Sequence, residues 1–316
     1  MKFVVMGAGG VGGYFGARLA ADGNEVAFVA RGAHAEAMRR DGLRIHSQLG
    51  DVHIAAPLVP EDVRDIGLVD IVLFCVKLWD VEAAAAAVKP LLAHDAAVVP
   101  LQNGVSVEDT LAEILGPQYV MGGVAQIGAA IERPGVIRHH GTMARLVFGE
   151  RDGSSTWRLE GLLSACVAAG IEAKASTAID VDIWEKFVFL APIAGATCRD
   201  RCAIGGVMGD AARRARFTAM VDEAVAVGRA KGVALDDDVA ARVVAFTQGL
   251  PGDMKTSMLN DLEAGRRLEL DWLNGQIVRL GRELGVPTPE NEAVCAALKP
   301  YAMGRTHRDP AGATKK

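Results

Sequence analysis

The sequence has no excess of basic residues and no long apolar run. Its 34 Lys and Arg residues are outnumbered by 39 Asp and Glu residues, which gives a formal net charge of -5. Without a general positive field, we expect no binding to nucleic acid or to an anionic membrane surface. No uncharged stretch approaches the ~18 apolar residues that a membrane helix needs. The best candidate, residues 187–198, has the length of a buried core helix and contains Pro192, so we expect a soluble protein.

The sequence also lacks a paired set of cysteines. Its five cysteines are scattered along the chain: Cys75, Cys166, Cys198, Cys202 and Cys295. An odd, scattered set does not resemble a secreted disulfide framework, and it favours a reducing cytoplasm. Cys198 and Cys202 have the wrong spacing for a zinc knuckle, so we expect no metal site. The adjacent His139 and His140 lie in a predicted hairpin and could be metal ligands, but neighbours on a strand point to opposite faces, so a solvated turn is favoured.

The first half of the chain alternates short β-branched runs with alanine-rich helical segments. The runs are residues 3–6, 25–30, 71–76 and 97–101. This alternation predicts a parallel sheet with crossover helices. Between the second and third runs, residues 43–54 suggest a hairpin, because Gly50 and Asp51 separate two short alternating runs.

The pattern changes after Gly122. Antiparallel strands added to the sheet are predicted at 124–131, 136–138 and 145–148. From about Ser154 the pattern is helical to the end. At roughly 150 residues per domain, 316 residues predict two domains. We place their boundary near Thr177, giving residues 1–177 and 178–316, because a small and polar stretch there precedes a new amphipathic segment.

A glycine-rich loop follows the first strand directly. Its residues are Gly7, Ala8, Gly9, Gly10, Val11 and Gly12. They fit the pattern G-x-G-x-x-G, and a helical segment follows at 14–21. Gly7 permits the tight turn, Gly9 lets the backbone approach a pyrophosphate, and Gly12 lets helix and strand pack closely. A glycine-rich turn without a ligand is the simpler alternative, but this context predicts dinucleotide binding.

The fold class is therefore α/β, with an N-terminal Rossmann-type dinucleotide-binding domain followed by an all-α C-terminal domain. In a domain that binds NAD, an acidic residue near the end of the second strand holds the ribose 2′-hydroxyl. Here Arg31 stands at that place. A guanidinium can bind a 2′-phosphate with two hydrogen bonds, so NADP is favoured over NAD. The alternative is that Arg31 is an ordinary solvated side chain.

The second half contains a lysine at the front of an otherwise apolar helix. Lys186 follows Trp184 and Glu185, and Ile183 and Phe187 lie on one face of that helix. A lysine beside apolar surface can have a lowered pKa and then donate a proton during carbonyl reduction. From the segment alone, a lysine whose amine simply reaches solvent is the favoured interpretation. A second polar cluster, residues 255–275, is equally consistent with a solvated helical hairpin.

These residues together give the chain a resemblance to the ketopantoate reductase (2-dehydropantoate 2-reductase) family over nearly its whole length. Besides the glycine loop and Arg31, the resemblance rests on five motifs. They are VKLW at 76–79, QNG at 102–104, WEK at 184–186, TSML at 256–259 and ELDWLNG at 269–275. The last three lie outside any generic nucleotide-binding fold.

The resemblance implies NADPH-dependent reduction of a 2-oxo acid to a 2-hydroxy acid, of 2-dehydropantoate to pantoate or of a related substrate. It implies that Lys186 protonates the substrate carbonyl oxygen and that Glu269 is its acidic partner. Asn103 would contact both cofactor and substrate, Ser257 would bind the substrate carboxylate, and Lys77 would line the cofactor site. A 2-oxo acid needs such groups: a donor for its carboxylate and a proton donor for the incipient alkoxide.

Three positions depart from the family pattern. Leu190, Ala194 and Met254 stand where typical members have asparagines that contact substrate. Because apolar side chains replace amides, we expect selection against a substrate hydroxyl and a preference for a less polar 2-oxo acid.

Two competing functions fit the same fold. A related 3-hydroxyacid dehydrogenase would oxidise a 3-hydroxy acid, but Arg31, Ser257 and Glu269 argue against it. A non-catalytic NADP-sensing protein would keep the fold without turnover, and the retention of Lys186 and Glu269 opposes that. The sequence leaves open which acyl side chain is accepted, the physiological direction, and whether the chain forms a homodimer, because apolar helix faces serve cores and interfaces alike.

Overall fold

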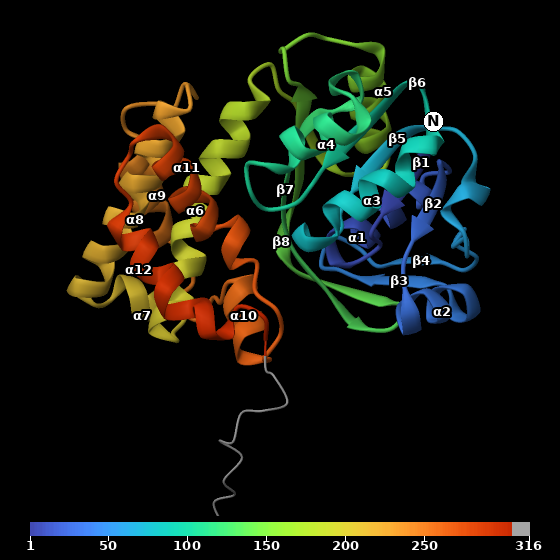
Figure 1. The fold of residues 1–316 in the computed structure, drawn as a ribbon. Coiled ribbons are helices and arrows are strands. Elements are labelled where there is room, and N and C mark those ends of the chain that lie inside the picture. The colour runs from blue at the N-terminus through green and yellow to red at the C-terminus, as the bar shows by residue number, and fades with distance from the viewer. Residues whose placement is uncertain (305–316) are drawn as a thin grey trace, which may run out of the picture. The chain divides into compact units, whose positions relative to one another are not determined.

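The structure is a computed structural model that describes residues 1–304 of the chain. It confirms an α/β N-terminal part and a helical C-terminal part (Figure 1). The chain divides into two compact units. The first contains Met1–Gln102 and Ser106–Ile183, and the second contains Asn103–Val105 and the chain from Trp184 onward. The end of the predicted second domain, 305–316, lies outside the described residues.

The first unit is built on a four-stranded parallel sheet with the strand order β2-β1-β5-β6. The strands are β1 (Lys2–Met6), β2 (Glu25–Val29), β5 (Val69–Phe74) and β6 (Leu92–Pro100). Their central residues are buried without alternation, as in a parallel sheet covered by helices. The prediction of a parallel sheet from four β-branched runs is confirmed.

A second sheet has the order β4-β3-β8-β7, and β9 pairs with β8. Its strands are β3 (Leu43–His46), β4 (Val52–Ile54), β7 (Met121–Arg133), β8 (Val136–Glu150) and β9 (Glu172–Ala175). The predicted hairpin at 43–54 is confirmed as the antiparallel pair β3 and β4. The prediction that the later antiparallel strands extend the parallel sheet is wrong. Instead β8 pairs with β3 and β7 pairs with β8, since the alternation of a strand does not specify its partner.

The short strand β9 is a second correction, because the sequence after Ser154 predicts helices to the end of the chain. Its residues, Glu172–Ala175, include no β-branched side chain. They form a strand because β8 offers a parallel partner, with Arg145 opposite Glu172 and Phe148 opposite Ala175. Such pairing is a tertiary effect and leaves little signal in the local sequence.

Five helices lie wholly within the first unit: α1 (Gly10–Ala21), α2 (Gly32–Asp41), α3 (Val81–Val88), α4 (Val107–Leu115) and α5 (Trp157–Ala168). Helix α1 packs against β1 and β2 and also against β4, β7 and β8 of the second sheet. Its first turn therefore lies where the carboxyl edge of the parallel sheet meets the long β7–β8 hairpin.

The second unit is helical. Its helices are α6 (Ile179–Asp200), α7 (Ile204–Met208), α8 (Ala211–Ala230), α9 (Val239–Gln248), α10 (Ser257–Glu263), α11 (Asn274–Leu284) and α12 (Pro289–Leu298). The predicted core helix at 187–198 is confirmed as part of α6, which contains Pro192 and continues through it. The two compact units part inside α6, between Ile183 and Trp184, whereas the sequence places the boundary near Thr177.

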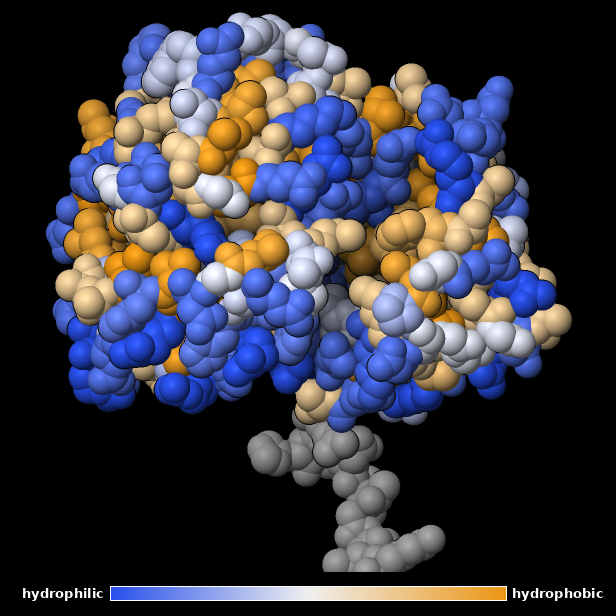
Figure 2. Space-filling view, turned by 180° about the vertical axis from the view of Figure 1, so that it is seen from behind, coloured by the Kyte–Doolittle hydropathy of each residue, from blue (hydrophilic) through white to orange (hydrophobic). Residues whose placement is uncertain are grey.

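The surface mixes hydrophobic and hydrophilic residues. On the face that Figure 2 shows, orange and blue residues lie among one another. Exposed large apolar side chains such as Leu68, Met143 and Phe246 lie far apart in the sequence. Single exposed apolar residues of this kind are usual on globular proteins. Within residues 1–304, no helix has both the length and the apolar character needed to cross a membrane.

Candidate cofactor and catalytic residues

The glycine loop connects β1 to α1 and is fixed to the neighbouring strands by its backbone. The N–H groups of Gly7 and Ala8 both donate to the carbonyl of Val29, at 3.1 and 2.9 Å. Gly7 has φ of +99°, and a Cβ there would lie 2.9 Å from the backbone of Cys75. Only glycine fits this combination of left-handed backbone and close approach, as the motif predicts.

The remaining glycines of the loop explain how the helix can start so close to the sheet. A Cβ on Gly12 would lie 2.4 Å from the carbonyl oxygen of Gly7, and a Cβ on Gly10 would lie 2.3 Å from that of Ala129 in β7. Around Gly9, by contrast, no atom lies within 4 Å of where a Cβ would be. This side of the loop is open, and the first N–H groups of α1 have no partner within the helix. The loop therefore fits the pyrophosphate of a dinucleotide.

Arg31 precedes α2 at the end of β2, where the sequence predicts it. Its side chain is 70% exposed, and its Nη1 lies 3.6 Å from Oδ1 of Asp80. Asp80 closes a single 3₁₀ turn, Leu78–Asp80, that follows β5 and is preceded by Lys77. The Nζ atom of Lys77 lies 5.6 Å from the centre of the Trp79 ring, a cation–π contact. Arg31 and Lys77 thus follow β2 and β5, the two strands on either side of β1, at the sheet edge where open α/β folds bind ligands.

Gln102 follows the fourth parallel strand at the same edge. Its Nε2 donates to the carbonyl of Val76, at 3.2 Å. Its Oε1 is buried and has no hydrogen-bond partner among the described residues. A buried unpaired acceptor costs free energy, so it calls for an explanation, such as a donor from a bound molecule. The next residue, Asn103, groups with the second compact unit.

In the second unit, Lys186 lies in the second turn of α6 and is half-buried. Its neighbours Trp184 and Phe187 are almost fully buried and pack edge to face, with ring centres 5.5 Å apart. The preceding Glu185 faces α9, where its carboxylate accepts a hydrogen bond of 2.7 Å from Arg242. Apolar packing on one side and this ion pair on the other fix the helix segment that carries Lys186.

Ser257 is the first residue of α10 and is exposed. Its neighbour Thr256 caps the helix by accepting the N–H of Leu259, at 3.2 Å. The Thr256 hydroxyl also lies 3.0 Å from that of Thr197, a fully buried residue of α6. Helix α10 therefore begins in direct contact with the helix that carries Lys186.

Glu269 precedes the 3₁₀ turn Leu270–Trp272 and is half-buried. Its carbonyl oxygen accepts the N–H groups of Trp272 and Leu273, at 3.2 and 3.1 Å. Asn274 follows and begins α11 with its side chain fully buried. The Nδ2 atom of Asn274 lies 2.5 Å from where a Cβ on Gly195 would be. The turn that carries Glu269 is thus also packed on α6.

The predicted residues consequently fall into two sets. The glycine loop, Arg31 and Lys77 lie in the first unit. Lys186, Ser257, Glu269 and Asn103 lie in the second.

The three departures from the family pattern differ in their exposure to solvent. Met254 is 46% exposed, Leu190 is partly exposed and Ala194 is buried.

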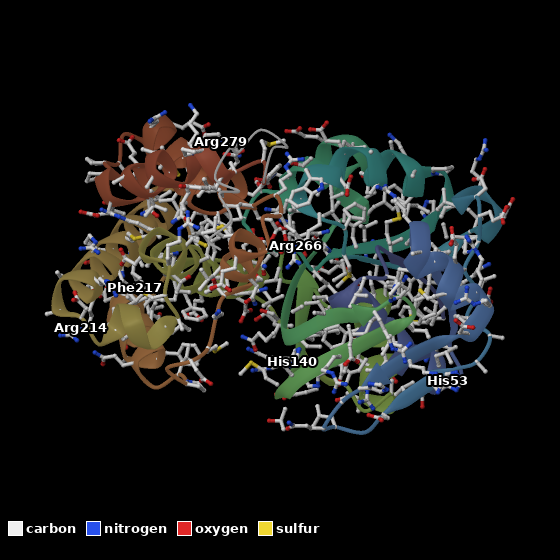
Figure 3. All side chains as sticks on the ribbon, turned by 90° about the horizontal axis from the view of Figure 1, so that it is seen from below. His53, His140, Arg214, Phe217, Arg266 and Arg279 are labelled. Carbon is white, nitrogen blue, oxygen red and sulfur yellow. The ribbon has the colours of Figure 1, made fainter. Side chains whose placement is uncertain are left out.

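The two adjacent histidines lie within β8, so the preference for a solvated turn is wrong. His139 is buried, with its Nδ1 2.9 Å from the Ser47 hydroxyl and its Nε2 2.9 Å from the carbonyl oxygen of Met143. His140 is exposed on β8 (Figure 3). The expectation that they face opposite sides is confirmed.

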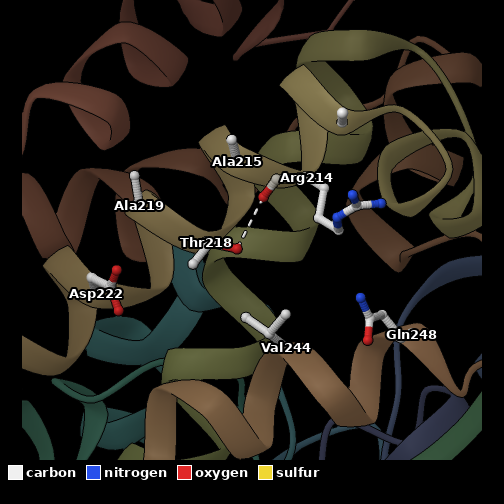
Figure 4. Close-up of a pocket in the computed structure, with 8 residues that line it drawn as sticks. Arg214, Ala215, Thr218, Ala219, Asp222, Val244 and Gln248 are labelled. Atoms are coloured by element: carbon white, nitrogen blue, oxygen red, sulfur yellow. Dashed lines mark hydrogen bonds between the residues drawn. The ribbon is translucent and has the colours of Figure 1, made fainter.

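A groove of about 460 Å³ runs between α8 and α9 in the second unit (Figure 4). Residues that line it include Arg214, Thr218 and Asp222 of α8 and Val244 and Gln248 of α9. None of the predicted site residues lines this groove.

Both parts of the chain match known family models. Residues 3–153 match the model described as Ketopantoate reductase PanE/ApbA, and residues 178–302 match Ketopantoate reductase PanE/ApbA C terminal. The chain is 32% identical to a 2-dehydropantoate 2-reductase of Mesorhizobium japonicum, over 96% of this chain and 99% of the relative. It is 33% identical to an uncharacterized oxidoreductase of Bacillus subtilis, YkpB, over 95% of this chain and 99% of the relative.

A solved structure shows the same likeness. A PanE/ApbA family ketopantoate reductase from Ralstonia eutropha superposes with a TM-score of 0.87 at 35% sequence identity. The match covers 96% of this chain and 98% of that one. The likeness therefore extends over both compact units and is not confined to the dinucleotide-binding part.

Proposed function

Because this chain belongs to the ketopantoate reductase family, we propose that it is an NADPH-dependent reductase of a 2-oxo acid less polar than 2-dehydropantoate. The coarser statement, that it is an oxidoreductase using a nicotinamide cofactor, follows from the family itself. The observation that carries the proposal is the joint presence of Lys186, Ser257 and Glu269 in one compact unit, each of them accessible.

In the proposed reaction the bound cofactor supplies a hydride to the carbonyl carbon of the substrate. The electron pair of the carbonyl bond then moves to oxygen, and Nζ of Lys186 donates the proton that this oxygen takes up. Ser257 donates its hydroxyl hydrogen to the substrate carboxylate, and Asn103 orients the substrate. Glu269 is assigned as the acidic partner of Lys186, as the family resemblance implies.

The residues of the first unit support NADPH as the cofactor. The exposed guanidinium of Arg31 is available to pair with a 2′-phosphate, and a planar fork suits that group better than a ribose hydroxyl. The open side of the glycine loop at Gly9 suits the pyrophosphate.

Two side chains support a less polar substrate. Leu190 and Met254 are both accessible and apolar, at places where typical family members have amides. A substrate hydroxyl that lost its amide partners there would be desolvated without compensation. Ala194 is buried, so its contribution would act through packing.

The test is NADPH oxidation, followed by nicotinamide absorbance, with a panel of 2-oxo acids that contains ketopantoate and graded apolar analogues. We expect the highest kcat/KM for an apolar analogue. A value for ketopantoate of about 10⁴ M⁻¹s⁻¹ or more would contradict the proposed shift in specificity.

Lys186→Ala is the matched control for chemistry. It should abolish turnover while NADPH affinity, measured by nicotinamide fluorescence, stays within about twofold of wild type. Binding of NADPH with no turnover across the whole panel would instead favour the sensing protein. Reduction of NADP⁺ by 3-hydroxy acids in the same assay would favour the 3-hydroxyacid dehydrogenase.

A further inference from the structure

His34 lies on α2, three residues after Arg31, and both nitrogens of its half-buried ring are bonded. The N–H of Gly135 donates to Nδ1 at 3.0 Å. Because a backbone N–H can only donate, Nδ1 must be the unprotonated acceptor nitrogen. The ring hydrogen is then on Nε2, which donates to the carbonyl oxygen of Ala8 at 2.9 Å. The hydrogen-bond pattern therefore fixes one neutral tautomer.

One of these two bonds ends on the glycine loop. The carbonyl of Ala8 belongs to the same peptide plane as the N–H of Gly9. That N–H donates to the carbonyl of Gly7, at 2.8 Å. The Ala8–Gly9 peptide is thus held at both ends, by His34 and by Gly7. Gly9 is the residue directly before α1, so this plane determines the direction in which the helix begins.

The other bond ends on the turn between β7 and β8. Gly135 is buried in this turn with φ of +77°, and a Cβ on it would lie 3.2 Å from the Cβ of Ala37 in α2. The same hairpin touches the start of α1 directly, because a Cβ on Gly13 would lie 2.2 Å from the side chain of Ile137. The hairpin thus supports the glycine loop by direct packing and through His34.

We propose that His34 is a positioning residue for the dinucleotide, whose ring ties the glycine loop to the β7–β8 turn and so holds the loop's N–H groups in their anion-binding direction. The proposal rests on the proposed function only in requiring that the chain binds a nicotinamide dinucleotide. Burial lowers the pKa of His34, which favours the neutral ring that both bonds need.

Two substitutions can separate the two bonds. The amide of His34→Gln reaches about as far as Nε2 and can still donate to Ala8, but it loses the acceptor for Gly135. The shorter amide of His34→Asn reaches about as far as Nδ1 and can still accept from Gly135, but it loses the donor to Ala8. Each variant keeps one of the two bonds, so their structural costs are matched.

The experiment is a titration of each variant with NADPH, followed by nicotinamide fluorescence in the absence of substrate, with thermal unfolding measured in parallel. We expect His34→Asn to bind NADPH about tenfold more weakly than wild type, the loss that corresponds to one hydrogen bond. His34→Gln should stay within about threefold of wild type, although both variants unfold at lower temperature. Equal losses of affinity in both variants, or none in His34→Asn, would overturn the positioning role.

A measurement on the wild-type protein gives a second test that does not depend on the folding of a variant. If the two hydrogen bonds of His34 favour cofactor binding, then by thermodynamic linkage cofactor binding must stabilise these hydrogen bonds. Hydrogen exchange at the Gly135 amide should therefore slow when NADPH is added, more than exchange at the amide of Ile45 in β3. Unchanged exchange at Gly135 in NADPH-saturated protein would contradict the proposal. Neither test contains substrate, so both remain valid if the proposed substrate is wrong. A wild-type protein that binds no dinucleotide would overturn both the proposed function and the positioning role of His34.

Discussion

Glu108 is a buried acid in the first turn of α4, only 6% exposed. Burial raises the pKa of its carboxyl to about 7, and nearby Arg151 opposes this only in part. The ordinary pKa of the carboxyl is 4.5. Between these two values the folded protein binds more protons than the unfolded chain, so the free energy of unfolding falls as pH rises through this window.

Glu108→Gln removes that penalty and should stabilise the protein above about pH 7, by at most about 3 kcal/mol, with little effect below about pH 4. Melting temperatures of wild type and variant at both pH values provide the measurement. Glu113→Gln, an exposed change in the same helix, is the control and should show no such pH dependence. An equal effect of Glu108→Gln at both pH values would show that the carboxyl titrates normally.

The Asp80 carboxylate lies 3.6 Å from the Arg31 guanidinium, to which we expect the 2′-phosphate of the cofactor to bind. The carboxylate and the phosphate would therefore both interact with Arg31. Replacing the carboxylate removes a negative charge from the place where another would bind. We expect Asp80→Asn to tighten NADPH binding about threefold, the size of an exposed ion pair, and to leave NADH binding unchanged. Fluorescence titrations with both cofactors measure this. The control is Glu82→Gln, which removes a neighbouring charge. A similar gain in NADPH affinity in this control would show that the effect comes from overall charge and not from the pairing of Asp80 with Arg31.

The sequence alone predicts those residues whose role depends on the conformation of their own segment. Gly7 and Gly12 are recognisable because a left-handed turn and close helix packing allow only glycine, and both requirements are met in the structure. The partner of Arg31 is different. Asp80 is distant in the sequence, and only the order of the parallel strands brings it close. His34 carries no motif at all, because its role depends on a carbonyl and an N–H from two other elements.

At the scale of elements, α6 and α11 meet at a glycine. Gly195 leaves room for Asn274, whose Nδ2 donates to Oδ1 of Asn291 at 2.9 Å. Asn291 in turn donates to the Glu223 carboxylate at 2.7 Å. The Oδ1 atom of Asn274 is buried without a hydrogen-bond partner within residues 1–304. A buried chain of polar groups with one unpaired atom has little tolerance for displacement.

Gly195→Ala should therefore destabilise the protein by about 2 kcal/mol, although the same change at an open helix position stabilises by up to about 1 kcal/mol. Its Cβ would lie 2.5 Å from Nδ2 of Asn274 and would displace that side chain. Chemical denaturation measures the change. In the double variant with Asn274→Ala, the cost of Gly195→Ala should largely disappear, because the obstacle is gone. Additive costs would show that the two residues do not interact.

The elements themselves differ in how far the sequence predicts them. The four parallel strands are runs of buried β-branched residues, so their pattern alone identifies them. The strands of the second sheet have recognisable turns, but nothing local says that β8 joins β3 and leaves the parallel sheet. Element type follows from local chemistry, whereas the choice of partner is made by the packing of the whole unit.

At the scale of the whole molecule, the matched family models cover both parts of the chain, and the fold class predicted from the sequence is confirmed. The candidate residues of the helical part could be named only through the family resemblance. Lys186 taken alone fits a solvated helix start, and residues 255–275 taken alone fit a charged hairpin. Their assembly in one unit depends on contacts such as Thr197 with Thr256, which no periodicity reveals.

The grouping of Asn103–Val105 with the helical unit affects how the two halves of the chain can be exchanged by recombination. These three residues are encoded within the dinucleotide-binding half, inside the span of the first family model, yet they pack as part of the other unit. Recombination between two such genes near codon 178 would transfer the helices and leave these residues behind. We therefore expect a hybrid protein to pack correctly only where both parent sequences have the same residues at 103–105. This short loop thus limits which pairs of genes can exchange their two halves.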